Sequence, residues 1–184
     1  MRDLSLHLLD LAQNSVRANA ALVEIMVSVD ESRLITITIR DDGSGMSDEL
    51  KERVTSPFAT TRTTRKVGLG IPLMMQNARL AGGDVRIDST LGQGTTLTAT
   101  LHGDSIDCLP LGDLAGTVVS LVSANPERPD FRLSCSSPKG SMDFDTREMR
   151  QALGNVPLNE PEITAWMLSA IQEEIEPIFG GVIL

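Results

Sequence analysis

The sequence predicts an α+β protein in which a mainly antiparallel mixed sheet carries its helices on one face. Apolar residues recur at steps of three and four over residues 4–16, which indicates an amphipathic helix. Two pairs of short strand-like segments, 23–29 with 34–40 and 84–89 with 95–101, indicate two hairpins. The order helix, hairpin, loop, helix, hairpin is typical of a two-layer α/β sandwich.

The first half of this pattern starts with a helix that Asp3 caps and that runs to about Ala18. The hairpin 23–40 follows, with one apolar face on each strand. A short helix is expected over 48–54. The next segment, 56–67, is polar, threonine-rich and basic, and is expected to be a loop.

The second half starts at Gly68-Leu69-Gly70-Ile71-Pro72, which opens a helix. Its proline is tolerated because it lies in the first turn, where no backbone donor is needed. Gly82-Gly83 ends this helix, and the second hairpin follows. Together these elements define a first unit, residues 1–102.

Residues 103–184 are predicted to form a second unit, a small α/β extension. They hold 5 basic and 13 acidic residues, whereas residues 1–102 hold 11 and 12. This difference indicates two units with different partners. The predicted elements of the extension are a buried helix over 112–124, strands over 131–136 and 141–145, a helix that Thr146 caps and that runs to Leu153, and a last helix from Asn159 or Glu160 to Phe179.

The composition excludes several classes of function. A net charge of −9 and an aromatic content of 3%, without tyrosine, disfavour a nucleic-acid partner. Cys108 and Cys135 lack metal-ligand spacing and are expected to be reduced thiols. We expect a cytoplasmic protein without a membrane partner, because no leader and no apolar run of about 18 residues is present.

The segment Asp41-Asp42-Gly43-Ser44-Gly45-Met46 carries most of the functional information. It follows an alternating strand, so a carboxylate at a strand end lies next to a glycine turn with exposed N–H groups. This arrangement suits a purine base whose exocyclic amine needs an acceptor. By itself the motif is weak, because Asp-Gly turns are common in ordinary loops.

Four further segments, together with this motif, resemble the motifs of one protein family. Residues 9–15 resemble the Asn box, 41–46 the first glycine box, 57–62 the Phe box and 68–73 the second glycine box of the GHKL ATPases, and residues 92–95 resemble their Gly-x-Gly-Thr. Residues 1–102 thus resemble the ATP-binding domain shared by histidine kinases, gyrase B, the mismatch-repair clamp and the heat-shock chaperone of that superfamily. The resemblance implies a Bergerat-type fold that binds ATP and Mg²⁺.

The resemblance also implies roles for single residues. Asn14 would supply an oxygen to Mg²⁺. Asp10 lies one turn earlier on the same face, where hydrolysing relatives place a Glu that activates water. Because Asp is one methylene shorter, two readings stay open: Asp10 acts at the γ-phosphate, or it is structural or orients Mg²⁺.

At the other end of the ligand, Asp41 would accept a hydrogen bond from the adenine amino group. Thr95 resembles the residue that shares a water with the base. Gly43 and Gly45 would let the backbone approach the ring, and Met46 is a further residue expected to bind ATP.

The loop between residues 60 and 70 would cover the phosphates. Arg62 and Lys66 are expected to neutralise phosphate charge, and Arg65 is either a third such residue or simply solvated. The start of the following helix offers backbone N–H groups to an anion. The further residues expected at this end are Phe58, Thr60, Thr61, Gly68, Leu69, Gly70 and Ile71. The loop is short, and it lacks the Gly-Thr that often precedes the second glycine box.

Three functions are compatible with these features. The first is a Mg²⁺–ATP-binding protein that hydrolyses ATP or transfers its γ-phosphate to a separate protein, as the anti-sigma-factor kinases that it resembles do. His7 is not expected to be a phosphoacceptor. The second is a nucleotide-gated interaction module with little catalysis, whose acidic region binds a protein partner or a second copy of the chain. The third is a remnant that binds no nucleotide.

Overall fold

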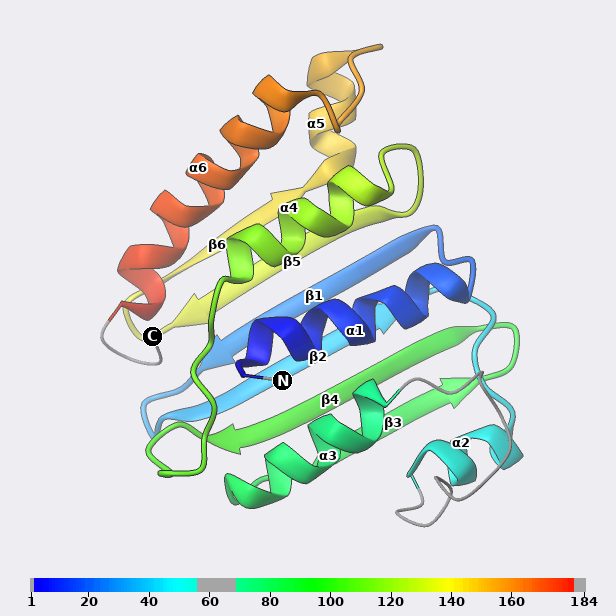
Figure 1. Cartoon of the computed structure of the whole chain (residues 1–184), viewed down its shortest axis with the longest axis vertical. Helices are drawn as coiled ribbons and strands as arrows, with labels where there is room; N and C mark the ends of the chain where they lie inside the picture. Colours follow the sequence, from blue (N-terminus) through cyan, green and yellow to red (C-terminus); the bar gives the residue numbers. More distant parts are fainter. Residues whose placement is uncertain (1, 56–68, 181–184) are drawn as a thin grey trace.

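Six strands form one sheet in the order β3-β4-β2-β1-β5-β6 (Figure 1). The computed structural model describes residues 2–55 and 69–180. The strands are β1 (Leu22–Val29), β2 (Leu34–Asp41), β3 (Val85–Thr90), β4 (Gly94–His102), β5 (Asp130–Ser137) and β6 (Gly140–Asp145). The helices are α1 (Leu4–Arg17), α2 (Asp48–Thr55), α3 (Gly70–Leu80), α4 (Leu114–Ala124), α5 (Thr146–Leu153) and α6 (Pro161–Phe179).

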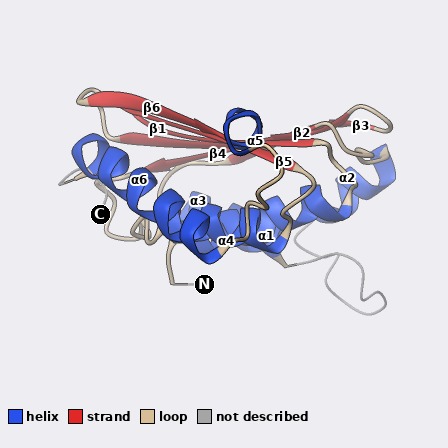
Figure 2. Ribbon diagram, turned by 90° about the horizontal axis from the view of Figure 1, so that it is seen from above, coloured by secondary structure: helices blue, strands red, loops and turns tan. Residues whose placement is uncertain are grey.

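In the described part of the chain, helices α1, α3, α4 and α6 lie against one face of the sheet, and none of these four lies on the other, open face (Figure 2). Alternate residues of the strands, such as Ile25, Ile37 and Leu133, point into the helix layer and are at most 1% exposed. Their neighbours on the open face are polar and only partly buried, as with Thr38 and Thr98. This confirms the predicted α+β sandwich.

The two hairpins of residues 1–102 meet through β2 and β4, which pair antiparallel from Leu34↔His102 to Asp41↔Thr95. Strand β5 then pairs with β1 in parallel, from Leu22↔Asp130 to Ser28↔Ser136. The acidic segment after residue 102 therefore continues the same sheet. This parallel pairing makes the sheet mixed.

The beginning of α1 is held by both parts of the chain. Asp3 caps the helix, and its Oδ1 accepts the N–H of Leu6 at 2.9 Å. The carbonyl oxygens of Pro110 and Leu111 accept the N–H groups of Leu4 and Ser5, also at 2.9 Å. The N–H donors at a helix N-terminus have no acceptor inside the helix. The connection between β4 and α4 supplies two such acceptors.

The predicted starts of α4 and α5 are wrong by one or two residues. Thr146 is the first residue of α5, and its cap is Asp145, whose carboxylate accepts the N–H of Arg147. Helix α4 begins at Leu114 after the cap Asp113, whereas Gly112 has a φ of 75° and is not helical. In both cases an aspartate offers the first turn an acceptor, which the predictions overlooked.

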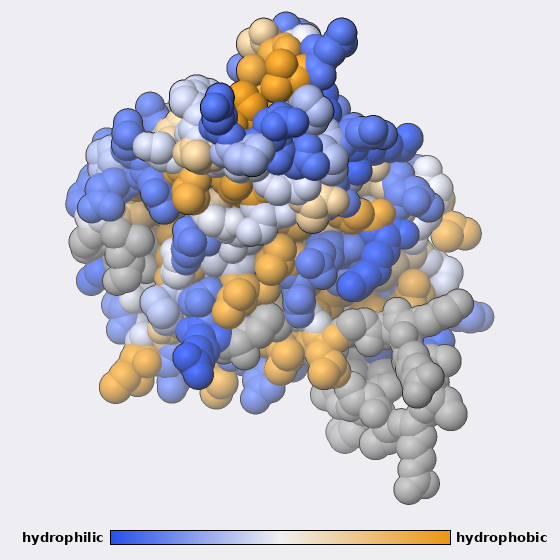
Figure 3. Space-filling view, turned by 45° about the horizontal axis from the view of Figure 1, so that its top comes forward, coloured by the Kyte–Doolittle hydropathy of each residue, from blue (hydrophilic) through white to orange (hydrophobic). Residues whose placement is uncertain are grey.

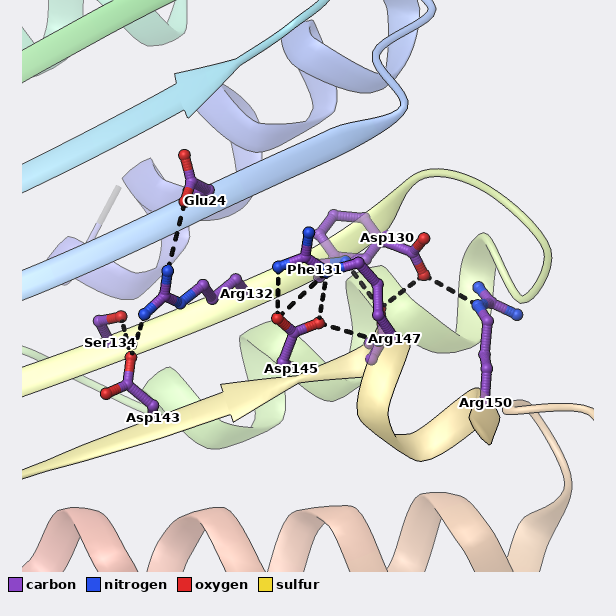
Figure 4. Close-up of polar contacts among 10 residues, drawn as sticks. Glu24, Asp130, Phe131, Arg132, Ser134, Asp143, Asp145, Arg147 and Arg150 are labelled. Carbon is purple, nitrogen blue, oxygen red and sulfur yellow. Dashed lines mark hydrogen bonds and ion pairs between the residues drawn. The ribbon is translucent and has the colours of Figure 1, made fainter. Parts of the chain in front are cut away.

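Ion pairs cross the open face from β1 over β5 to β6 (Figure 4), and one further pair joins β1 to β2. Glu24 on β1 pairs with Arg40 on β2 and with Arg132 on β5, each at 3.7 Å. Arg132 also pairs with Asp143 on β6 at 3.0 Å, and Ser134 donates to the same carboxylate at 2.5 Å. This ladder connects the two parts of the chain on the sheet face opposite α1, α3, α4 and α6.

The side of the molecule shown in Figure 3 presents apolar residues in several separate groups among polar ones. Among the described residues, the large hydrophobic side chains that are most exposed are Ile106, Leu91, Leu69 and Trp166. None of the helices within 2–55 and 69–180 combines the length and apolar character needed to cross a bilayer.

Candidate functional site

A cavity of about 250 Å³ opens between α1, α2, the start of α3 and the ends of β2 and β4. Its walls are mainly apolar side chains of Leu11, Ile39, Met46, Leu50, Val54, Ile71 and Leu97. The polar groups at its surface come from Asn14, Ser15, Arg17, Asp41, Ser44 and Thr95. A concave apolar site with a few convergent polar groups is typical of small-ligand binding.

Asp41, the last residue of β2, places a buried carboxylate in this cavity. It is only 9% exposed. Its Oδ2 accepts the hydroxyl of Ser15 at 2.6 Å, and its Oδ1 accepts the N–H of Gly43 at 2.9 Å. Each carboxylate oxygen has a further lone pair, so Asp41 is a fixed acceptor that can still receive a donor from a ligand.

The glycine turn after Asp41 packs against protein backbone on both sides. Ser44 donates its N–H to the carbonyl of Ala18 at 2.8 Å and accepts the N–H of Gly92 at 2.7 Å. Gly45 has a φ of 64°, and a Cβ there would lie on the carbonyl oxygen of Thr90. Gly45 is thus required by the fold itself, whatever the ligand.

Asp42 has a different task from its neighbour. Its Oδ1 accepts the N–H groups of Ala21 and Leu22 at 2.7 and 3.0 Å. Partial burial works against ionisation, yet these backbone donors keep the pKa of the Asp42 carboxyl below its usual range. Asp42 therefore secures the start of β1 beside the glycine turn.

The phosphate end expected from the sequence lies where α1 meets α3. A Cβ on Gly70, the first residue of α3, would lie 3.2 Å from the Cβ of Asp10. Asn14 lies one turn further along α1, lines the cavity, and accepts Arg17 Nη1 on its Oδ1 at 3.2 Å. The structure thus brings Asp10, Asn14 and the α3 N-terminus to one end of the site.

The donor set fits Mg²⁺ without forming a complete cage. The carboxylate of Asp10 and the amide oxygen of Asn14 are hard oxygen donors, which Mg²⁺ prefers. Within 2–55 and 69–180, no group of three or more His, Cys, Asp or Glu side chains could hold a metal. A Mg²⁺ ion bound by one or two protein oxygens and by nucleotide phosphates needs no such group.

The predicted site residues fall into three sets. Asn14, Asp41, Gly45, Met46, Ile71 and Thr95 line one cavity. Asp10, Gly43 and Gly70 lie beside residues that line it, and Leu69 is 61% exposed directly before α3. Phe58, Thr60, Thr61, Arg62, Arg65, Lys66 and Gly68 lie outside the described residues, so their expected roles remain predictions.

Two serines of the site carried no role in the sequence-based predictions. Ser15 donates to Asp41, and Ser89 on β3 contacts both Met46 and Thr95. The position of Ser15 directly after Asn14 was a signal for its role. Ser89 had no such signal, because only the β3–β4 pairing brings it next to the glycine turn.

His7, a residue of α1, is fully buried and contacts α3. Its Nε2 lies 2.7 Å from the side-chain amide of Asn77, while its Nδ1 has no hydrogen-bond partner among the described residues. Burial lowers the pKa of the His7 imidazole, since the charged form loses its hydration. A ring without access to solvent is a poor phosphoacceptor, and the expectation for His7 stays a prediction.

Comparison with known proteins identifies the class. The family model for histidine kinase-, DNA gyrase B- and HSP90-like ATPases matches residues 2–105. The chain belongs to this family, and the cavity lies within the matched part of the chain. Residues 2–105 therefore form an ATP-binding domain of the histidine-kinase-like type.

Two of the similar proteins are histidine kinases that match part of this chain. The chain is 33% identical over 88 residues to an uncharacterized sensor-like histidine kinase of Rhizobium meliloti. This match covers 44% of this chain and 17% of that protein. It is 35% identical over 77 residues to the sensor histidine kinase WalK of Bacillus subtilis, covering 39% of this chain and 13% of WalK. Both matches thus span less than a fifth of the relative.

One solved structure resembles nearly the whole chain. The N-terminal domain of a DNA repair protein aligns with 98% of this chain and 58% of its own, with a TM-score of 0.52 and 14% identity. At this identity the likeness concerns the fold alone. It includes the part of the chain after residue 105, which the family model does not match.

Proposed function

We propose that this protein binds Mg²⁺–ATP in the cavity and hydrolyses it or transfers its γ-phosphate to a separate protein. The observation that carries the proposal is the buried Asp41 carboxylate in the wall of an apolar cavity of about 250 Å³. A base with an exocyclic amine satisfies this acceptor, and its flat ring suits the apolar walls.

The other end of the cavity supports a role for the phosphates. Asn14 and Asp10 offer oxygens to Mg²⁺, which when bound would neutralise phosphate charge. Gly70 starts α3 beside Asp10, so the N-terminus of α3 lies next to these oxygen donors. The N-terminus of a helix favours anions, which agrees with phosphates lying there.

Calorimetric titration of the full chain with ATP and Mg²⁺ tests binding. We expect saturable binding to the wild type and a loss of at least about 100-fold in affinity for Asp41→Asn, because the amide presents a donor to the amine. Asp84→Asn is the matched control, since its side chain is 73% exposed and lies outside the cavity. Equal affinity of wild type and Asp41→Asn would overturn the proposal.

Turnover of γ-labelled ATP tests the chemistry. Release of labelled phosphate, or its appearance on an added protein, would support an enzyme. Asp10→Asn should then lower turnover more than affinity, because a group that acts at the γ-phosphate contributes mainly in the transition state. Asp10→Glu should keep turnover, since the family places Glu at this position.

A nucleotide-gated interaction module is the second candidate, and one observation favours it. The carbonyls of Pro110 and Leu111 hold the first turn of the helix that carries Asp10 and Asn14. A shift of α1 on nucleotide binding would therefore reach the second part of the chain. Tight ATP binding with neither phosphate release nor a labelled protein would select this function over catalysis.

A further inference from the structure

Ser89 makes three hydrogen bonds that join separate parts of the site. Its hydroxyl oxygen accepts the N–H of Met46 at 2.8 Å and donates to the carbonyl of Gly94 at 3.0 Å. The third contact is with the hydroxyl of Thr95, at 2.8 Å between the two oxygens. Ser89 is 8% exposed, so water does not compete freely for these groups.

The protons of this cluster can be assigned by counting. A serine hydroxyl has one proton and two lone pairs. The N–H of Met46 takes one lone pair, and the proton goes to Gly94, whose carbonyl cannot donate. The contact with Thr95 is then a hydrogen bond only if Thr95 donates its own proton to Ser89.

This assignment decides what Thr95 offers to a ligand. With its proton directed to Ser89, the Thr95 oxygen has only lone pairs left for the cavity that it lines. Thr95 is also the register partner of Asp41 across β2 and β4. Two neighbouring groups of the cavity wall are thus acceptors, and neither has a proton to give.

We propose that Ser89 is a positioning residue that sets base selectivity, by holding Thr95 as an acceptor beside Asp41. The wall then favours a purine with an amine at position 6 and disfavours one with a carbonyl there, because two acceptors repel each other when no proton lies between them. This inference rests on the proposed ATP binding and adds a determinant outside the residues that line the cavity.

A purely structural role for Ser89 predicts something else. Its bond to Met46 also anchors the glycine turn, so its loss could loosen the pocket for every nucleotide. Such loosening would weaken all purine triphosphates by a similar factor. The ratio of two affinities separates the two roles, since only the proposed role changes it.

The test is calorimetric titration with ATP and with inosine 5′-triphosphate, each with Mg²⁺, of the wild type, Ser89→Ala and Ser89→Thr. Ser89→Ala frees the Thr95 proton, which can then turn to a carbonyl at position 6. We expect the preference for ATP to fall about tenfold, the size of one hydrogen bond to a buried group. Ser89→Thr keeps the hydroxyl and should restore the preference.

A second background shows whether Ser89 acts through Thr95. In Thr95→Val the hydroxyl is absent, so adding Ser89→Ala should leave the ATP-to-inosine-triphosphate ratio unchanged. If Ser89→Ala does not fold, Ser89→Cys carries the same test, because a thiol of similar size is only a weak hydrogen-bonding group.

The outcomes separate this inference from the proposed function. An unchanged ratio in Ser89→Ala, or a change that persists without the Thr95 hydroxyl, would overturn the role of Ser89 while ATP binding stands. A wild-type chain that binds neither triphosphate would overturn the proposed function itself.

Discussion

Residues 1–102 and 103–184 share one sheet but contribute differently to the site. Every cavity-lining residue within the described part of the chain belongs to the first region, from Leu11 to Leu97. The second region carries most of the acidic excess and adds β5 and β6 to the sheet. Its contacts with the first region include the β1–β5 pairing, the support of α1, the packing of α4 against α1 and the ion-pair ladder.

This difference shows that ligand chemistry and helix support come from separate parts of the sequence. The first region holds the acceptors and oxygen donors that we expect to contact ATP. The second region supplies the carbonyls that hold α1, the helix with Asp10 and Asn14. The central claim is therefore a nucleotide pocket in the first region whose main helix is held by the second.

The largest effect is expected from Leu133→Ala on β5. Leu133 is fully buried, and deleting such a side chain costs about 2–5 kcal/mol of unfolding free energy. Because β5 pairs with β1, both regions should lose stability together. Trp166 fluorescence follows the second region, and hydrogen exchange at Ile37 follows the first.

Leu80→Ala, at a side chain that is 55% exposed, is the control and should change stability by less than about 0.5 kcal/mol. If Leu133→Ala destabilised only the second region, the two regions would be independent units and the comparison would fail.

Gly112→Ala tests the support of α1 directly. Gly112 has a φ of 75°, and a Cβ there would lie 2.6 Å from Oδ1 of Asp3, the cap of α1. We expect a loss of about 2–3 kcal/mol in stability, from backbone strain and a displaced cap, together with weaker Mg²⁺–ATP binding.

Gly154→Ala is the matched control for this substitution. Gly154 has a similar φ of 61°, but nothing lies within 4 Å of an added Cβ. It should cost about 1–2 kcal/mol of stability from strain alone and leave nucleotide affinity unchanged. Equal losses of affinity in both variants would refute the support of α1 by the second region.

The pH dependence of stability near pH 6.5 should include a contribution from the first region, where the buried His7 lies. Burial lowers the pKa of His7 in the folded state. As the pH falls, the unfolded chain therefore binds a proton at His7 before the folded chain does. Stability should therefore fall as the pH drops below about 6.5, by at most about 1.4 kcal/mol per pH unit for this group.

Chemical denaturation of wild type and His7→Gln between pH 5 and pH 8 measures this contribution. The variant should lose the part of the slope that belongs to His7, and His102→Gln serves as the control at the exposed end of β4. Identical slopes in wild type and His7→Gln would show that the buried imidazole is not responsible.

The smallest effect is expected from Arg132→Met, which removes the middle of the ion-pair ladder. Exposed pairs of this kind contribute about 0–1 kcal/mol, and salt reduces the contribution. Denaturation at low and at high salt should show a difference from wild type only at low salt. A large loss that salt does not change would mean that the ladder joins the regions more strongly than the sheet does.

The sequence predicted the helices, the hairpins and the residues around Asp41 because their signals are local. Alternation, caps and glycine turns all act within a few residues, as at Asp3 and Gly45. The expected neighbours Asn14, Asp41 and Thr95 came from family motifs, and the structure places them around one cavity.

The parallel pairing of β1 with β5 could not be predicted in the same way. It joins residues about 100 positions apart, and no local sequence pattern predicts which residues of the two strands pair. The role of Ser89 depends equally on long-range pairing, since β3 and β4 bring it beside Met46 and Thr95. The support of α1 by Pro110 and Leu111 uses backbone carbonyls, which carry no sequence signature.

The most direct test of the pocket is a crystal structure of the full chain with a non-hydrolysable ATP analogue and Mg²⁺. We expect the exocyclic amine of the base at about 3 Å from the carboxylate of Asp41, and the phosphates between Asn14 and the start of α3. A base bound away from Asp41, or outside the cavity between α1 and the ends of β2 and β4, would contradict the account.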